Sequence, residues 1–79
     1  MTHNLERIGE IVCRIGALPG IAPDEDFYEA GFSSVRALEL LFELETAYNV
    51  SIPDDDFIGT RCIRGLQEMI CRLTEEQVG

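Results

Sequence analysis

The sequence of 79 residues has no tryptophan, few other aromatic residues and no long apolar run. A membrane-spanning helix needs about 18 consecutive, mostly apolar residues, and no segment approaches that length. The start of the sequence also lacks the basic, apolar and small-residue order of a secretion signal. These absences argue against a membrane protein and predict a cytoplasmic location.

Histidine and cysteine are also scarce. The single histidine, His3, lies near the start of the chain and has no candidate partner for a catalytic dyad. The three cysteines, Cys13, Cys62 and Cys71, are odd in number and lack CxxC spacing, which argues against both disulfides and a zinc site. We expect free, mostly buried thiols. The acidic residues lack the ligand order of a calcium loop, so we expect neither an enzyme nor a metalloprotein.

Positive charge is almost absent from the middle of the chain. Ten acidic residues and one arginine, Arg36, lie between Asp24 and Asp56, whereas five acids and five arginines balance in the rest of the sequence. The formal net charge of −9 therefore resides in this central segment. Such a cluster favours basic protein partners and disfavours nucleic acid and anionic membranes.

Apolar residues recur at helical spacing in most of the chain, and no β-strand alternation is present. The pattern predicts helices over 4–17, 34–48 and about 53–59, and a last helix from residue 61 or 62 to 73. Proline and glycine in 18–26 predict a long loop between the first two helices. The tail after Thr74 is expected to fray. The predicted fold is all-α, a four-helix bundle with a short third helix, in which residues 1–79 form one domain.

The helix predicted over 34–48 carries two apolar rows. One row is typical of a core-facing stripe and consists of Ala37, Leu40, Leu41, Leu44 and Tyr48. A second row, with acidic neighbours Glu39 and Glu45, consists of Val35, Leu38 and Phe42. This second row either widens the core or forms a docking strip for a partner protein, and its acidic neighbours fit the second interpretation.

A serine pair, Ser33 and Ser34, precedes this apolar run. The first amides of a helix are unpaired and carry partial positive charge, so a hydroxyl placed there suits a phosphate ester. Ser34 is therefore the candidate attachment point for a phosphate-linked group. The alternative is structural, since serine is a preferred N-cap residue and satisfies a free amide without any further role.

Several motifs together give the sequence a specific resemblance. They are Ala30-Gly31-Phe32-Ser33-Ser34-Val35, Leu38-Glu39-Leu40, Leu44-Glu45 and Ile52-Pro53-Asp54. In this order and spacing they resemble the acyl and peptidyl carrier proteins, a phosphopantetheine-binding family whose pattern is Gly-x-Asp-Ser-Leu, then an acidic helix, then Ile-Pro-acid. The resemblance extends over essentially the whole chain.

The resemblance implies a function and a set of site residues. Ser34 matches the serine to which a phosphopantetheinyl transferase attaches 4′-phosphopantetheine from coenzyme A. The arm's thiol would then hold an aminoacyl or acyl group as a thioester for delivery to partner enzymes. Residues matching the family's partner-binding positions are Val35, Glu39, Phe42 and Glu45, and Leu38 of the second apolar row is a further partner-binding candidate. Implied partners are an amino acid:carrier protein ligase or another adenylate-forming ligase, and a downstream acyl or aminoacyl transferase.

Two positions depart from the common pattern. Ser33 stands where aspartate is usual, and Arg36 stands where many fatty-acid carriers have an acid. Serine also caps helices, so the local fold should survive, while Ser33 becomes a rival acceptor. The Gly-x-Ser-Ser variant resembles stand-alone carriers paired with amino acid:carrier protein ligases. A carrier for a polyketide, nonribosomal peptide or lipid pathway remains the alternative within the family, and an unmodified acidic adaptor the alternative outside it.

Overall fold

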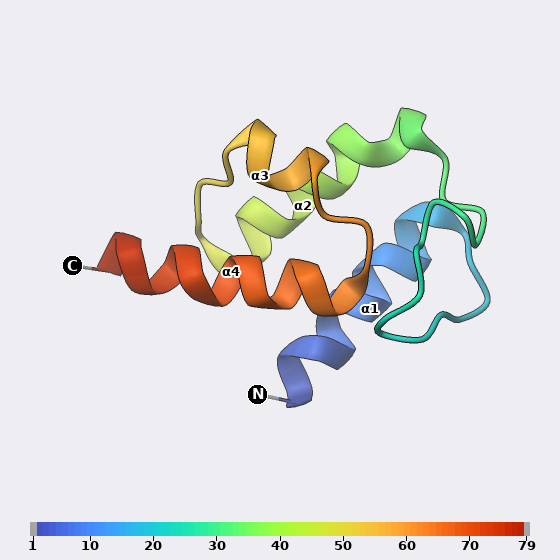
Figure 1. Ribbon diagram of the computed structural model, residues 1–79, viewed down its shortest axis with the longest axis horizontal. Helices are drawn as coiled ribbons and strands as arrows, with labels where there is room; N and C mark the ends of the chain where they lie inside the picture. Colours follow the sequence, from blue (N-terminus) through green and yellow to red (C-terminus); the bar gives the residue numbers. More distant parts are fainter. Residues whose placement is uncertain (1, 79) are drawn as a thin grey trace.

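The computed structural model describes the backbone of residues 2–78 and the side chains of residues 5–75. In chain order the described helices are α1 (Thr2–Gly16), the 3-10 turn η1 (Ser34–Arg36), α2 (Ala37–Tyr48), α3 (Asp54–Ile58) and α4 (Ile63–Val78). Figure 1 shows α4 crossing in front of α1, α2 running from the upper right to behind α4, and the short α3 above α4. No strand occurs within residues 2–78, so the predicted all-α bundle with a short third helix is confirmed.

The apolar stripes of the sequence form one core, as predicted. The buried side chains of the three long helices are Ile8, Ile11, Val12, Ile15, Leu40, Leu41, Leu44, Ile63, Leu66, Met69, Ile70 and Leu73. Because each set recurs at three- and four-residue steps, each helix presents a single apolar face to the others. Phe57 is the buried residue of α3, and it anchors that five-residue helix to the core.

Two helix boundaries differ from those predicted by more than two residues. The segment predicted to be helical from Ser34 begins as the 3-10 turn η1, and regular α-helix starts at Ala37. Helix α4 does not end at residue 73 but continues to Val78, so the predicted end of the last helix is wrong. Asn49, in contrast, ends α2 in the left-handed conformation predicted for it, with φ of 52°.

The loop between α1 and α2 is fixed by buried aromatic rings. Phe27 and Phe32 are both buried, and their ring centroids lie 5.4 Å apart. The amide of Phe32 donates to the carbonyl of Phe27 at 2.9 Å, which closes a turn between them. Gly31 in this turn has φ of 120°, a conformation that only glycine adopts readily. A Cβ at Gly16 would lie 2.5 Å from the Phe32 ring, so the end of α1 also needs glycine.

The same loop is joined to the start of α4 by ion pairs and backbone hydrogen bonds. Arg61 Nε lies 2.6 Å from Asp26 Oδ2, and Arg64 Nε lies 2.7 Å from Asp24 Oδ1. The amide of Phe27 also donates to the Arg61 carbonyl at 2.9 Å. The residues that precede Ser34 are therefore held from two sides, by α1 and by α4.

One polar atom in the core is unsatisfied. The hydroxyl of Tyr48 is buried without a hydrogen-bond partner among the described residues. Burial raises the pKa of this phenol. The Tyr48 ring itself makes stabilising contacts, because it packs against the core and the Arg7 guanidinium lies 5.7 Å from its centroid.

We expect Tyr48→Phe to stabilise the protein by about 1 kcal/mol, because it removes a buried group that water satisfies in the unfolded chain. The measurement is the free energy of unfolding in a urea titration. Tyr28→Phe is the matched control, since the Tyr28 hydroxyl is not a buried unsatisfied atom, and we expect little change there. A loss of stability in Tyr48→Phe would contradict this assignment.

Candidate functional site

The two serines have different roles in the structure. Ser33 is the N-cap of η1, and its Oγ accepts a hydrogen bond from the Val35 amide at 3.3 Å. Ser34 is exposed, and its hydroxyl has no hydrogen-bond partner among the described residues. The purely structural interpretation of a capping serine thus applies to Ser33, which leaves the Ser34 hydroxyl available to solvent and to another protein.

The amides around Ser34 are already engaged. The Val35 amide donates to Ser33 Oγ, the Arg36 amide donates to the Ser33 carbonyl at 3.0 Å, and the Ala37 amide donates to the Ser34 carbonyl. The sequence-based rationale that unpaired amides would hold a phosphate here is therefore wrong for these three groups. The partial positive charge of the helix start remains, but it offers no free amide at these positions.

The second apolar row of the sequence is not part of the core. Val35 is 86% exposed, Leu38 is 59% exposed and Phe42 is 57% exposed. Of the two interpretations left open by the sequence, core widening is wrong. Ile58 on α3, which the sequence analysis did not single out, is 70% exposed. Its signal in the sequence was an apolar residue directly after Phe57 in a helix too short to bury both.

The two acidic residues assigned to this row differ in their engagement. Glu39 is exposed, and its Oε1 lies 3.4 Å from Arg36 Nη1, a weak surface pair. Glu45 is half-buried, and its Oε2 accepts a hydrogen bond from the Ile52 amide at 2.8 Å. One oxygen of Glu45 thus fixes the segment that leads into α3, a structural role that the sequence did not reveal.

Two adjoining hollows lie beside Ser34, between α2 and α3. The first, here called the Arg61 hollow, has a volume of about 370 Å³ and is lined by Tyr28, Ser34, Ala37, Phe57, Ile58 and Arg61. The second, the Asp54 hollow, has a volume of about 300 Å³. It shares Ser34, Ala37, Phe57 and Ile58, and adds Leu38, Leu41 and Asp54. The serine therefore stands between a cationic and an anionic recess.

Asp26 holds the cationic side of this arrangement in place. Its Oδ1 accepts hydrogen bonds from the amides of Tyr28 and Glu29, and its Oδ2 accepts one from Arg61. The hydrogen bond from Arg61 is the main cause that lowers the pKa of Asp26 below its ordinary 3.8. The Arg61 guanidinium lies 5.0 Å from the centroid of the Tyr28 ring. One carboxylate thus positions both Tyr28 and Arg61 in the Arg61 hollow.

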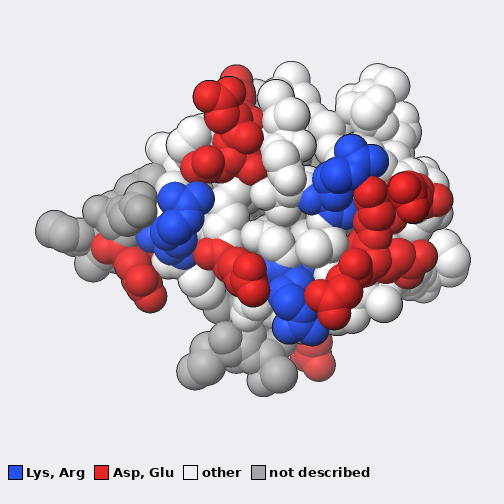
Figure 2. All heavy atoms as spheres, viewed as in Figure 1, with Lys and Arg blue, Asp and Glu red and all other residues white. Residues whose placement is uncertain are grey.

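The central acidic cluster is partly neutralised in the folded chain. Arginines from α1 and from the C-terminal part of the chain pair with it, and the bridges are Arg14–Glu43, Arg61–Asp26, Arg64–Asp24 and Arg72–Asp56. Figure 2 shows blue groups lying next to red ones on the face that carries α4. The balance of charge along the sequence therefore differs from the balance on the surface. No such bridge is found for Asp54 or Asp55 in the described part of the chain.

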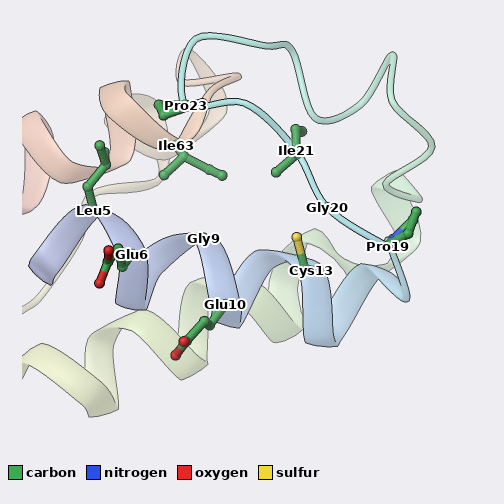
Figure 3. Close-up of a pocket in the computed structure, with 10 residues that line it drawn as sticks. All are labelled: Leu5, Glu6, Gly9, Glu10, Cys13, Pro19, Gly20, Ile21, Pro23 and Ile63. Carbon is green, nitrogen blue, oxygen red and sulfur yellow. The ribbon is translucent and has the colours of Figure 1, made fainter. Parts of the chain in front are cut away.

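A further pocket of about 610 Å³ lies between α1 and the loop that follows it. Figure 3 shows Cys13 and Ile21 facing this space, whereas Glu10 points away from the loop. Its lining among the described residues contains no arginine, so it lacks a cation for a phosphate group. Cys13, Cys62 and Cys71 are free, as predicted, but partly rather than mostly buried.

Other predicted features concern metal, membrane and histidine. No group of three or more metal-ligating side chains occurs among the described residues. Within the same part of the chain, no helix is long and apolar enough to span a bilayer. The side chain of His3 lies outside the described residues.

Comparison with known proteins gives two kinds of match. A family model described as "Phosphopantetheine attachment site" matches residues 6–74. The "Aminoacyl carrier protein" of Agrobacterium fabrum is 36% identical over 52 residues, which is 61% of this chain and 63% of that protein. The "Non-reducing polyketide synthase men2" of Menisporopsis theobromae is 33% identical over 73 residues, which is 91% of this chain but 3% of the synthase. The chain thus spans less than two thirds of either relative.

Because of the Asp26–Arg61 pair, we expect the free energy of unfolding to fall at acid pH. The unfolded chain has the ordinary pKa of Asp26 and the folded chain a lower one, so ionised Asp26 favours the folded state. Its contribution is complete above pH 3.8 and is lost as the pH falls through the lowered value. We expect Asp26→Asn, which keeps an acceptor for the two amides, to flatten the fall in unfolding free energy below that pH. Parallel pH profiles for the variant and the unaltered protein would contradict the prediction.

Proposed function

The chain belongs to the family of phosphopantetheine attachment domains, and on that premise we propose that Ser34 is the residue that carries the group. A domain of this family is a carrier rather than an enzyme, and its cofactor is covalently bound 4′-phosphopantetheine. A phosphopantetheinyl transferase and further partner enzymes act on such a domain. The residue, the cargo and the individual partners are the subject of the proposal.

One observation carries the assignment of Ser34. Ser33 accepts the capping hydrogen bond, and the Ser34 hydroxyl at the start of the helix is exposed and has no hydrogen-bond partner in the described part of the chain. The residues around it fit the group as well, since the exposed Val35 follows it and the Arg61 hollow adjoins it. The hydroxyl is therefore accessible to a transferase that approaches from solvent.

The attachment forms a phosphodiester. Ser34 Oγ bonds to the phosphorus of the pantetheine phosphate in coenzyme A, the bond to adenosine 3′,5′-bisphosphate breaks, and the transferase accepts the serine proton. The attached group supplies a terminal thiol that holds an aminoacyl or acyl cargo as a thioester. The chain itself positions the hydroxyl and presents a surface for partner enzymes, which raises the local concentration of the cargo at their active sites.

We propose an aminoacyl cargo, loaded by an amino acid:carrier protein ligase or another adenylate-forming ligase and passed to a downstream transferase. The similarity to the Agrobacterium aminoacyl carrier protein supports it. An acyl cargo is the second candidate, supported by the similarity to part of a polyketide synthase. Incubation of the arm-bearing protein with ATP and each ligase class, followed by intact mass, distinguishes the two.

For the attachment site, we expect the unaltered protein and Ser33→Ala to gain the mass of one phosphopantetheine when coexpressed with a transferase. We expect Ser34→Ala to gain none, because the accepting oxygen is gone. Intact-mass spectrometry is the measurement, and circular dichroism checks that all three proteins are folded. A mass gain in Ser34→Ala but not in Ser33→Ala would move the site. No gain in any of them, with partner binding retained, would favour an unmodified acidic adaptor.

The exposed row next to Ser34 is the proposed partner-binding surface. The surface consists of the row Val35, Leu38 and Phe42 with its acidic neighbours Glu39 and Glu45, and we now add Ile58. A complementary partner would present an apolar patch edged with arginine or lysine, because the row is apolar and its acidic neighbours are numerous. Of the two acids, Glu39 is the more available, since Glu45 accepts the Ile52 amide.

We expect Phe42→Ala to lower kcat/KM of the transferase for this carrier by about tenfold, the equivalent of about 1.4 kcal/mol of lost binding. Glu39→Gln should lower it less, and its effect should diminish at high salt. Glu68→Gln, the same change of charge at an exposed position on α4, is the control and should leave the rate unchanged. Equal effects at positions 39 and 68 would show that total charge, rather than this row, determines recognition.

A further inference from the structure

We propose that Arg61 is the counter-charge for the phosphodiester on Ser34 and directs the base of the arm toward Tyr28. This inference rests on the proposed function, because it requires Ser34 to be the modified residue. It assigns a positioning residue that lies 27 positions away in the sequence and belongs to the segment before α4.

A phosphate on Ser34 needs a cationic side chain because the nearby helix amides already have acceptors. A phosphodiester on Ser34 adds a negative charge to a chain whose formal net charge is already −9. The amides of Val35, Arg36 and Ala37 have acceptors within η1 and its cap. Helix amides are a common way to hold a phosphate, and here these three are occupied, so a side-chain cation becomes a more important source of direct stabilisation.

The two hollows beside Ser34 differ in charge, and this difference determines which of them a phosphate on Ser34 would favour. The Arg61 hollow contains a guanidinium and a phenol, whereas the Asp54 hollow contains a carboxylate. Opposite charges attract and like charges repel, so a phosphate oxygen next to Ser34 favours the Arg61 hollow. Among the described residues that line either hollow, Arg61 is the sole cation. Arg36, although near in sequence, lines neither hollow and pairs with Glu39.

The Arg61 side chain is arranged for this role. Its Nε donates to Asp26 Oδ2, so Nη1 and Nη2 remain for a second anion. The guanidinium lies 5.0 Å from the Tyr28 ring centroid, which restricts its orientation. Its side chain is nonetheless 56% exposed, so a phosphate can approach it from solvent. Guanidinium groups bind phosphate through paired hydrogen bonds, which the smaller ammonium group of lysine cannot reproduce.

Arg64 provides a matched control within the same protein. It also lies near the start of α4, is exposed, and donates through Nε to a loop carboxylate, Asp24, at 2.7 Å. It does not line the Arg61 hollow or the Asp54 hollow. Replacing either arginine removes one cation and one bridge between the loop and α4, so a difference between the two variants isolates the effect of position.

The experiment compares the unaltered protein, Arg61→Gln, Arg61→Lys and Arg64→Gln after modification by a transferase. The ³¹P chemical shift of the phosphodiester is the first readout, with free phosphopantetheine as the reference. The second is the Nε–Hε resonance of each arginine in the unaltered protein before and after modification. Intact mass establishes modification, and circular dichroism establishes folding. The ³¹P spectra are repeated at about 1 M salt, where the screening length falls to about 3 Å.

We expect modification to displace the Arg61 Nε–Hε resonance and leave that of Arg64 in place. We expect Arg61→Gln to move the ³¹P shift toward the free reference, Arg64→Gln to leave it unchanged, and Arg61→Lys to give an intermediate shift. High salt should move the unaltered protein in the same direction as Arg61→Gln. Because the arginine resonances are read in the unaltered protein, the proposal remains testable if a variant fails to fold.

Two results would overturn it in distinguishable ways. If the protein is modified but neither the Arg61 resonance nor the ³¹P shift responds, Arg61 is not the counter-charge and the proposed function stands. If the unaltered protein gains no mass with any transferase, the proposed function fails and this inference fails with it.

Discussion

The turn from Phe27 to Phe32 determines where α2 begins, and therefore where Ser34 lies. Its ends are joined by the hydrogen bond from the Phe32 amide to the Phe27 carbonyl, and both rings are buried. The Phe27 amide is in turn bound to the Arg61 carbonyl, so the same turn connects α1, α4 and the start of α2. The exposed serine depends on buried groups that precede it, and Gly16 and Gly31 are required there because a side chain would clash or strain the turn.

Much of the fold was predictable because helical periodicity records which face of a helix is buried. The apolar stripe of Ile63, Leu66 and Leu73 predicted which face of α4 is buried, and Asn49 predicted the end of α2. The exposure of Leu38 and Phe42 could not be decided from the sequence, because the width of the core depends on how the helices pack. The same holds for the 3-10 geometry of η1, which follows the Ser33 cap, and for the extension of α4 beyond residue 73.

The sequence predicted the candidate serine of the site but not the residues that surround it in the folded chain. The motif around Ser34 identified a candidate serine, and the structure shows that its neighbour Ser33 performs the capping. Arg61 and Asp26 are 35 positions apart, and no local sequence pattern predicts an ion pair between residues so far apart. Arginines outside the acidic segment likewise find their partners only when the chain folds. The net charge of each segment thus predicted that the surface potential is negative, but it could not predict which carboxylates pair with an arginine.

The partial burial of the three cysteines has a consequence for any cargo held as a thioester. Thiol exchange requires a thiolate that can reach the ester carbonyl, and an accessible cysteine on the carrier would compete with the enzymes that collect the cargo. Each cysteine here is partly shielded, and the Cys62 sulfur accepts a hydrogen bond from the Gly65 amide at 3.4 Å. Partial burial limits the approach of a cysteine thiolate to such an ester, so the packing that stabilises the bundle also bears on the lifetime of a reactive bond.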